Sequence, residues 1–195
     1  MNFFSRLTAV IATVIVVETL LVHALYRFVT EEHDVFRACS DRAGVGSPSD
    51  FVDYSGADIY YDDEGIHING SALILWDVKR TDRVSVLAEL KKFVRGGWQP
   101  TPLVVRTEDL CKELKNIHGY VYEVWSQYVF PEDLQCFAKG VIYRHKPFVL
   151  KVEGNTLVPM EGRYKIVLTL RAFDENNTPT SKTICLEVPG DIIKV

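Results

Sequence analysis

Few residues in this sequence are arranged in a way that could support catalysis. Asp62, Asp63 and Glu64 form a cluster of carboxylates, which in principle could serve acid–base chemistry or bind Ca²⁺. Gly65 follows them, and strand-like segments lie on both sides, which is the pattern of a solvated hairpin turn. We therefore interpret the acidic cluster as a turn.

The histidines and cysteines do not form a recognisable reactive group either. His67, His118 and His145 could each act as a base, but no candidate nucleophile lies near them in a known motif. The sequence contains no Gly-x-Ser-x-Gly, His-Glu-x-x-His, P-loop or Gly-x-Gly-x-x-Gly motif. No two cysteines have the spacing of zinc ligands. We predict that the protein is not an enzyme and binds no metal ion or other cofactor.

Cysteine usage points instead to disulfide bonds. Cys39, Cys111, Cys136 and Cys185 all lie beyond the N-terminal segment, and an even number is expected where every cysteine is paired. Four cysteines allow three different pairings, and their positions alone do not select one of them.

The N-terminal segment has the pattern of a secretory signal peptide. Arg6 precedes an apolar run over residues 7–17. Val22 and Ala24 then supply small residues at the −3 and −1 positions of a cleavage site. We therefore predict a signal peptide over residues 1–24, followed by a lead-in over 25–35.

An uncleaved membrane anchor is the alternative, because apolar residues resume at Leu25 and continue to Val29. Glu18, His23 and Arg27 argue against it, since polar groups at membrane depth cost a few kcal/mol each. In either case the rest of the chain faces an oxidising compartment. We predict a secreted, extracellular protein, with the lysosomal lumen or a membrane-anchored form as alternatives.

Two sequons fit an exported protein. Asn69-Gly70-Ser71 and Asn176-Asn177-Thr178 are both acceptable acceptor sequences for N-glycosylation. The second sequon lies in a polar loop, where a glycan would be solvated. We predict glycosylation of Asn69 and Asn176.

Composition favours one folded domain. A chain of 195 residues with 47% hydrophobic content can bury one ordinary core, which we place at residues 36–195. The formal net charge is −4 and no basic stripe is present, so nucleic acid is not an expected partner. The tripeptide Arg95-Gly96-Gly97 is interpreted as a turn between strands.

Period-two alternation of apolar and polar residues dominates the chain and predicts a mainly β fold. It is clearest over 83–91 and 162–173 and recurs at 148–152 and 184–188, whereas 72–78 is apolar on both faces and predicts a central strand. Turn signals occur at 62–65, 96–97, 153–155 and 174–179. We predict an immunoglobulin-like β-sandwich of two antiparallel sheets.

One short helix is expected in this sandwich. Over residues 107–117, Leu110, Leu114 and Ile117 fall on one helical face, and Glu108 precedes Lys112 by four positions. Residues 120–130 fit either a helix or a strand.

Large aromatic side chains are more numerous than a two-sheet core of this size obviously requires: Trp76, Trp98, Trp125, Phe130, Phe137, Tyr143 and Phe148. Two interpretations remain open. The rings could pack into a solid core, or they could line an apolar cavity between splayed sheets.

Three segments resemble the GM2-activator-like, MD-2-related lipid-recognition proteins. Residues 136–143, Cys-Phe-Ala-Lys-Gly-Val-Ile-Tyr, are similar to that family's Cys-Pro-x-Lys-x-Gly-x-Tyr stretch, although the proline is missing. Residues 162–170 and 184–186 resemble its closing hairpin, whose last strand bears the final cysteine. Residues 110–114, followed by an aromatic-rich stretch, are similar to the insect branch of secreted relatives, some linked with chemosensation. The resemblance spans about residues 105–195.

The resemblance implies disulfide bonds between Cys39 and Cys185 and between Cys111 and Cys136. It also implies an apolar cavity between the sheets that holds a lipid or another hydrophobic small molecule, with a polar headgroup near the rim. By position, the candidate cavity or rim contacts are Trp76, Trp125, Phe130, Phe148, Leu150, Ile166 and Leu168. The family's vertebrate activator has additional cysteines, so its enzyme-presenting role is not carried over.

The predicted function is therefore a secreted carrier of a hydrophobic ligand, with chemosensation as one setting. The alternative is an extracellular interaction module with a solid core, in which Trp98 and Tyr120 belong to a surface that binds a protein partner.

Overall fold

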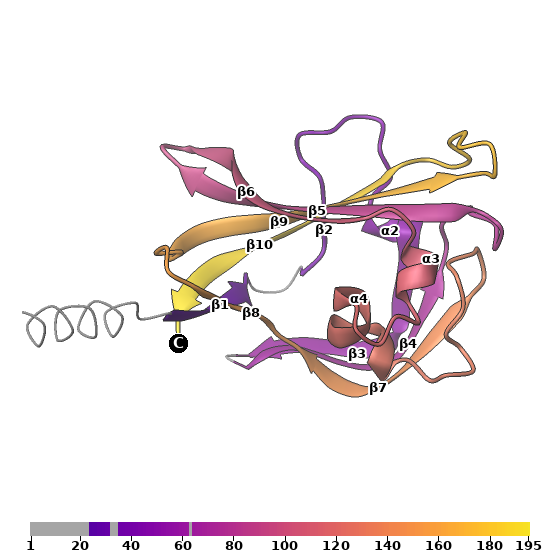
Figure 1. The fold of residues 1–195 in the computed structure, drawn as a ribbon, viewed down its shortest axis with the longest axis horizontal. Coiled ribbons are helices and arrows are strands. Elements are labelled where there is room, and N and C mark those ends of the chain that lie inside the picture. Colours follow the sequence, from indigo (N-terminus) through magenta and orange to yellow (C-terminus); the bar gives the residue numbers. More distant parts are fainter. Residues whose placement is uncertain (1–23, 32–34, 63) are drawn as a thin grey trace, which may run out of the picture.

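In a computed structural model of the protein, the described residues are 24–31, 35–62 and 64–195, and they form two antiparallel β-sheets in two layers (Figure 1). The larger sheet has the strand order β6-β5-β9-β10-β1-β8, and β2 also pairs with β10. Its strands are β6 (Gly97–Thr107), β5 (Arg83–Val94), β9 (Gly162–Phe173), β10 (Ile184–Lys194), β1 (Ala24–Thr30), β8 (Val152–Thr156) and β2 (Arg37–Ala38). The smaller sheet consists of β3 (Val52–Asp62), β4 (Gly65–Ile74) and β7 (Ile142–Leu150), in the order β3-β4-β7. The predicted mainly β sandwich is confirmed.

The strongest alternating segments form strands close to their predicted bounds. β9 spans the predicted 162–173, and β5 begins at Arg83 as expected but continues to Val94. β4 is the central strand of the smaller sheet, as expected for an apolar segment, although it ends at Ile74. Strand propensity and alternation agree in these segments, so local sequence is sufficient to define them.

The chain changes sheets at Lys151, which the sequence did not reveal. The alternation over 148–152 continues through the end of β7 and the start of β8, which belong to different sheets. Residues 153–155, predicted to form a turn, instead lie within β8 and pair with Leu25–Arg27 of β1. The prediction of a turn was wrong because Gly154 was interpreted as a turn residue. It lies instead in β8, an edge strand of the larger sheet, where glycine is tolerated.

The predicted lead-in contains a strand. β1 pairs with both β10 and β8, and its alternate residues Tyr26 and Phe28 are buried beside Tyr164 and Val188. The predicted signal peptide lies outside the described residues, apart from Ala24, with which β1 begins. Across the described residues, no helix is long and apolar enough to cross a membrane.

The described part of the chain contains several short helical segments in place of the one expected. These are α2 (Pro48–Phe51), α3 (Leu110–Glu113), α4 (Tyr120–Val124) and the 3₁₀ turn η1 (Ser126–Tyr128). The helix predicted over 107–117 is reduced to α3. Asp109 caps its first turn, and backbone bonds from Asn116 to Glu113 and from Gly119 to Asn116 turn the chain away soon after it.

Two of the predicted turns close hairpins. Asp62 pairs with Gly65 where β3 meets β4, and Val94 pairs with Gly97 where β5 meets β6. In the second turn both Arg95 and Gly96 have positive φ, 51° and 81°, which is the conformation of a type I′ hairpin turn.

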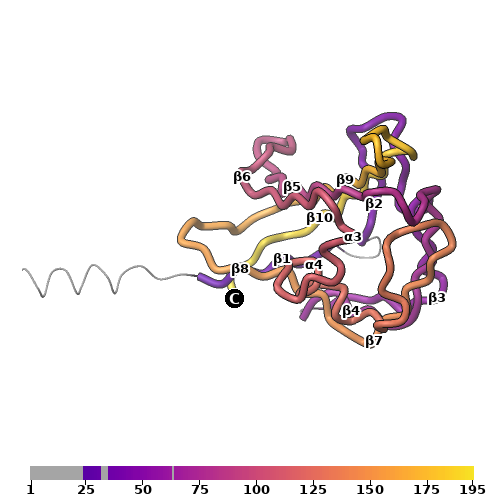
Figure 2. Tube along the Cα trace, turned by 45° about the vertical axis from the view of Figure 1, so that its right-hand side comes forward, coloured from indigo at the N-terminus to yellow at the C-terminus, as the bar shows by residue number. Residues whose placement is uncertain are grey.

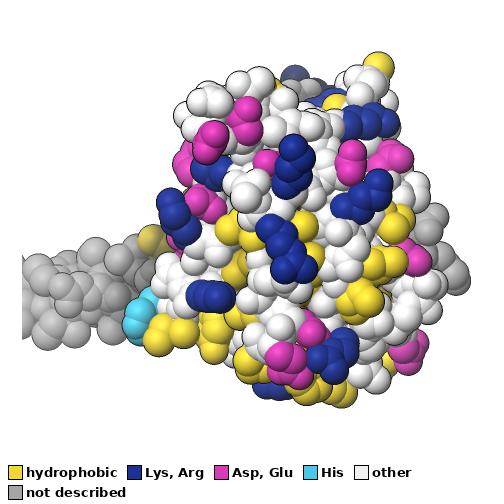
Figure 3. Space-filling view, turned by 90° about the vertical axis from the view of Figure 1, so that its right-hand side faces the viewer, with side chains coloured by type: hydrophobic (Ala, Val, Ile, Leu, Met, Phe, Trp, Pro, Cys, Tyr) yellow, Lys and Arg dark blue, Asp and Glu magenta, His cyan; other side chains and the backbone are white. Residues whose placement is uncertain are grey.

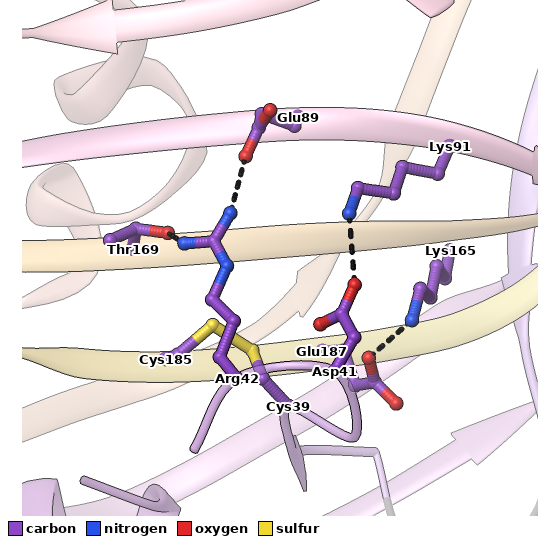
Figure 4. A network of polar contacts seen from close by, with 9 residues as sticks. All are labelled: Cys39, Asp41, Arg42, Glu89, Lys91, Lys165, Thr169, Cys185 and Glu187. Atoms are coloured by element: carbon purple, nitrogen blue, oxygen red, sulfur yellow. Dashed lines mark hydrogen bonds and ion pairs between the residues drawn. A yellow bond between two sulfur atoms is a disulfide. The ribbon is translucent and has the colours of Figure 1, made fainter. Parts of the chain in front are cut away.

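The residues 39–46, here called the strap, cross the outer face of the larger sheet (Figure 4). Cys39 forms a disulfide with Cys185 of β10, and Arg42 donates to Glu89 (3.1 Å) and to Thr169 (2.7 Å). Asp41 accepts a hydrogen bond from Lys91 at 3.3 Å, and this positive charge, with the hydrogen bond, holds the pKa of Asp41 below its usual value although burial opposes the shift.

The strap covers side chains that would otherwise face solvent. Val167 and Thr169 point outward from the central strand β9, yet they are only 0% and 2% exposed. Lys165, on the same face, is buried in an ion pair with Glu187 at 2.6 Å. The outer face is therefore closed by a disulfide and a set of ion pairs.

The second disulfide joins Cys111 of α3 to Cys136, which lies in the segment before β7. Both pairings are those implied by the family resemblance. This second bond closes the segment that contains α4 and η1, of which α4 lines the interior between the sheets.

Candidate ligand-binding site

The inner face of the larger sheet is incompletely covered by the rest of the protein. Ile166 and Leu168 point inward from β9, the central strand, but both retain accessible surface, whereas their outward neighbour Val167 is fully buried. Val86, Ala88 and Leu90 on the adjacent β5 are likewise only partly buried. The surface that these residues expose lies inside the sandwich.

This surface belongs to a cavity with two compartments, an outer one of about 390 Å³ and an inner one of about 320 Å³. Both sheets and the connecting segments contribute residues that line both compartments: Ala88, Val105, Leu168, Leu150, Phe36, Tyr120 and Val124. The two compartments are therefore adjacent and share an apolar lining between the sheets, and each is in the size range of small-molecule sites.

The cavity opens beside the edge strand β6 and helix α4. Leu103, Val104 and Tyr120 line the outer compartment and are about half exposed, at 50%, 50% and 51%. On the face turned toward the viewer in Figure 3, hydrophobic side chains gather across the middle and lower part, with Lys and Arg side chains among them. Apolar surface on this protein is thus accessible from solvent and not confined to the core.

Charged groups are confined to the outer compartment. Arg27, Asp62 and Glu89 line it. Arg27 bonds Glu153 at 2.6 Å, and Glu89 is paired with Arg42 of the strap. Lys, Arg, Asp and Glu are absent from the described residues that line the inner compartment. The two compartments therefore differ in that only the outer one has Arg, Asp and Glu residues in its lining.

One wall of the cavity is formed by α4 and Trp125, which follows it, and α4 lies between the two layers in Figures 1 and 2. The 3₁₀ turn η1 comes directly after Trp125. Trp125, between these two segments, donates its indole N–H to Nε2 of His145 on β7 at 3.0 Å. Ser126 donates to the carbonyl of Leu114 at 2.7 Å, and the ring of Tyr128 stacks on Phe148 at 4.3 Å. These contacts attach the wall to the smaller sheet and to α3.

His145 is a neutral side chain in this apolar setting. It is buried and lines the inner compartment, and burial lowers its pKa although the Gly70 carbonyl and the Asp133 charge oppose the shift. The hydrogen bond from Trp125 requires an unprotonated Nε2, which agrees with the direction of the shift.

Five of the seven predicted contact residues line the cavity in the structure: Trp125, Phe148, Leu150, Ile166 and Leu168. All but Trp125 lie on strands whose inward face was visible as alternation.

The other two predicted contacts, Trp76 and Phe130, do not line the cavity. Trp76 follows the end of β4, is 2% exposed, and donates its indole N–H to the Lys182 carbonyl at 2.8 Å. Phe130 lies after η1 on the surface, 37% exposed, with the cations of Arg144 and Lys146 over its ring. Neither residue lies inside a strand, so period-two positions did not apply to them.

Several lining residues were missed by the sequence analysis. Phe36 and Tyr54 stack on each other at 5.7 Å inside the cavity, but their segments show no clear period. Tyr120 and Val124 lie in the segment that fitted helix and strand equally well. Ala88 was on a recognised inward face, but its small side chain had not suggested a binding role.

The residues first considered for chemistry are dispersed. His67 pairs with Asp62 at 3.0 Å in the β3–β4 hairpin, and this contact lowers the pKa of Asp62, while His118 is exposed and His145 is buried. No group of three or more metal-ligating side chains occurs within the described ranges. Both sequon asparagines are exposed, Asn69 on β4 and Asn176 in the loop after β9. Their glycosylation stays a prediction.

No family model matches this sequence, and no curated protein matches it either.

Proposed function

We propose that this protein is a carrier that binds a lipid or another hydrophobic small molecule in the cavity between its sheets. The observation that carries the proposal is the apolar cavity lined by both sheets, with its two adjacent compartments. An apolar chain that enters it would gain roughly 25 cal/mol for each Å² of its surface removed from water. Binding would then depend on burial and need no reactive group.

The covalent and ionic bracing of the fold supports this proposal. A cavity gives up packing contacts that a solid core would make, so a hollow sandwich needs stabilisation elsewhere. Two disulfides and the ion pairs beneath the strap provide it on the outer face and at α3. The same disulfides are compatible with a secreted protein, which is the location we propose.

We further propose that the protein belongs to the GM2-activator-like, MD-2-related lipid-recognition family, in the branch of insect secreted proteins. The two disulfide pairings and the two-sheet architecture support this assignment. Carriage of a hydrophobic signal molecule in chemosensation is the setting that this branch suggests.

Native mass spectrometry of protein purified from secreting cells tests the carrier function, together with uptake of a fluorescent fatty acid. We expect copurifying lipid and saturable uptake of the probe. Ala88→Trp places a large ring where the two compartments meet and should abolish uptake, whereas Ala43→Trp on the exposed strap should leave it unchanged.

A folded protein that carries no lipid and takes up no probe would contradict the proposal. It would favour the alternative of an extracellular interaction module. Uptake that is equally strong in the Ala88→Trp variant would show that the probe binds elsewhere.

A further inference from the structure

The inner compartment has the lining of a site for an uncharged molecule. Its described residues include no Lys, Arg, Asp or Glu, and His145 is held neutral by the hydrogen bond that Nε2 accepts from Trp125. An ionised group placed there would lose its hydration and gain no partner, which is strongly unfavourable. Any charged headgroup must therefore remain outside this compartment.

Most polar side-chain atoms that face the inner compartment already have partners. The indole of Trp125 and Nε2 of His145 bond each other at 3.0 Å. The hydroxyl of Tyr143 donates to the Gln135 carbonyl at 2.7 Å. The hydroxyl of Tyr54, by contrast, has no hydrogen-bond partner among the described residues. Nδ1 of His145 also lacks a partner, but it is fully buried and out of reach of a ligand.

Tyr54 is held in place by its ring. It lies on β3 and stacks on Phe36 at 5.7 Å with an interplanar angle of 12°. Burial raises the pKa of Tyr54 to about 12, so the group is a neutral hydroxyl that can both donate and accept. Thr107 and Tyr120 also bring hydroxyls to this compartment, but Thr107 ends the edge strand β6 and Tyr120 is half exposed. Tyr54 is therefore the polar group best placed to recognise a buried ligand.

We propose that the inner compartment selects an uncharged apolar molecule that carries one oxygen function, such as an alcohol, ketone or ester, and bonds it to the hydroxyl of Tyr54. This inference rests on the proposed carrier function and adds the chemical class of the ligand. Because the hydroxyl of Tyr54 makes no hydrogen bond to the described residues, a ligand oxygen that reaches it adds a hydrogen bond to the free energy gained by burying the apolar part of the ligand.

Competition binding with ligands of one chain length tests the proposal. A long-chain primary alcohol, the corresponding alkane and the corresponding carboxylate would each displace a fluorescent apolar probe at pH 7.5, where the carboxylate is ionised. We expect the alcohol to bind about 10-fold more tightly than the carboxylate. Tyr54→Phe should weaken the alcohol about 5-fold and leave the alkane and the probe unchanged.

Tyr60→Phe is the matched control, because Tyr60 lies on the same strand, is 54% exposed and lines neither compartment, so losing its hydroxyl should not change the affinity for the alcohol. A carboxylate that binds the wild-type protein more tightly than the alcohol would overturn the proposal. So would an equal effect of Tyr54→Phe on alcohol and alkane. If the probe itself does not bind, the carrier function fails instead, so the two failures are distinguishable.

Discussion

Strand β9 faces a filled interior at its C-terminal end and a cavity at its centre. Ala172 is 1% exposed and pairs with Val84, which is fully buried, in the part of the core that contains Trp76; we call this region the solid end. Ile166 and Leu168, in the hollow centre, point to the same side of the strand but keep accessible surface. One strand thus serves both as core and as the wall of a site.

The difference arises from what lies opposite the sheet. At the solid end, α2 contacts β10 and α3 contacts β5, and Trp76 fills space beside Phe51. At the hollow centre the smaller sheet and α4 face β9 without filling the space between. The comparison teaches that a sandwich can be anchored at one end, which allows its middle to stay open.

The largest effect should come from truncating the solid end. Trp76→Ala removes a fully packed ring and leaves the Lys182 carbonyl without its donor. We expect the free energy of unfolding to fall by about 3–5 kcal/mol, measured by urea denaturation. Trp125→Ala, which borders the cavity, should cost distinctly less. Equal losses would show that the two regions are packed alike.

A matched pair on β9 sharpens the comparison within one strand. Leu170→Ala should cost about 2–4 kcal/mol because Leu170 is buried, with 5% exposure. Leu168→Ala should cost less than half as much, since Leu168 lines both compartments and is only partly buried, whereas Leu170 borders only the inner one. Chemical denaturation of both variants measures the difference, and a larger loss for Leu168 would contradict the hollow centre.

Enlarging side chains should also destabilise the solid end more than the hollow centre. Ala172→Leu overpacks the solid end and should destabilise the protein by about 1–3 kcal/mol. Ala88→Leu extends into the cavity and should change stability by less than about 1 kcal/mol. Thermal unfolding of the two variants tests this. A large loss for Ala88→Leu would mean that the space beside it is not free to be filled.

The smallest effect concerns pH in the hollow centre. The pKa of His145 is lowered from its ordinary value of 6.5, so the unfolded chain binds a proton more readily than the folded protein. The stability gained from keeping His145 neutral in the fold is therefore complete above about pH 6.5, and it is lost as pH falls toward the lowered pKa of the folded state. We expect the midpoint of urea unfolding to decline between pH 7.5 and 5.

The variant His145→Phe should reduce that decline, whereas His118→Gln, at an exposed position, should retain it. This pH range is separate from that of the carboxylates with lowered pKa values, such as Asp41 and Asp133, whose contribution to stability is lost only below the ordinary carboxyl pKa of 3.8. An unchanged decline in His145→Phe would assign the effect to another group.

Several features of the fold could be predicted because they depend on local patterns. The bounds of β9, the start of β5 and the two hairpin turns follow from alternation and from turn residues. Four of the five predicted contacts that line the cavity lie on such alternating segments. Trp76 and Phe130 were misplaced because they lie just outside regular elements, where residue type alone does not indicate direction.

The wall of the site could not be predicted for a different reason. Trp125 is oriented by its bond to His145, which is 20 positions away, and Tyr54 is oriented by its stacking on Phe36. These contacts depend on how the chain returns to the smaller sheet. The sequence of either segment has no periodic pattern from which these contacts could be predicted.

The sequence by itself determined which side chains of a strand share a face, because successive Cβ atoms point to opposite sides of a sheet. It also determined, through its turn residues, where the clearest hairpins close. Only the tertiary structure decided what that face meets. The distance between two layers depends on helices and connections remote in the chain, so Ala172 meets protein where Leu168, four residues earlier on the same face, meets a cavity.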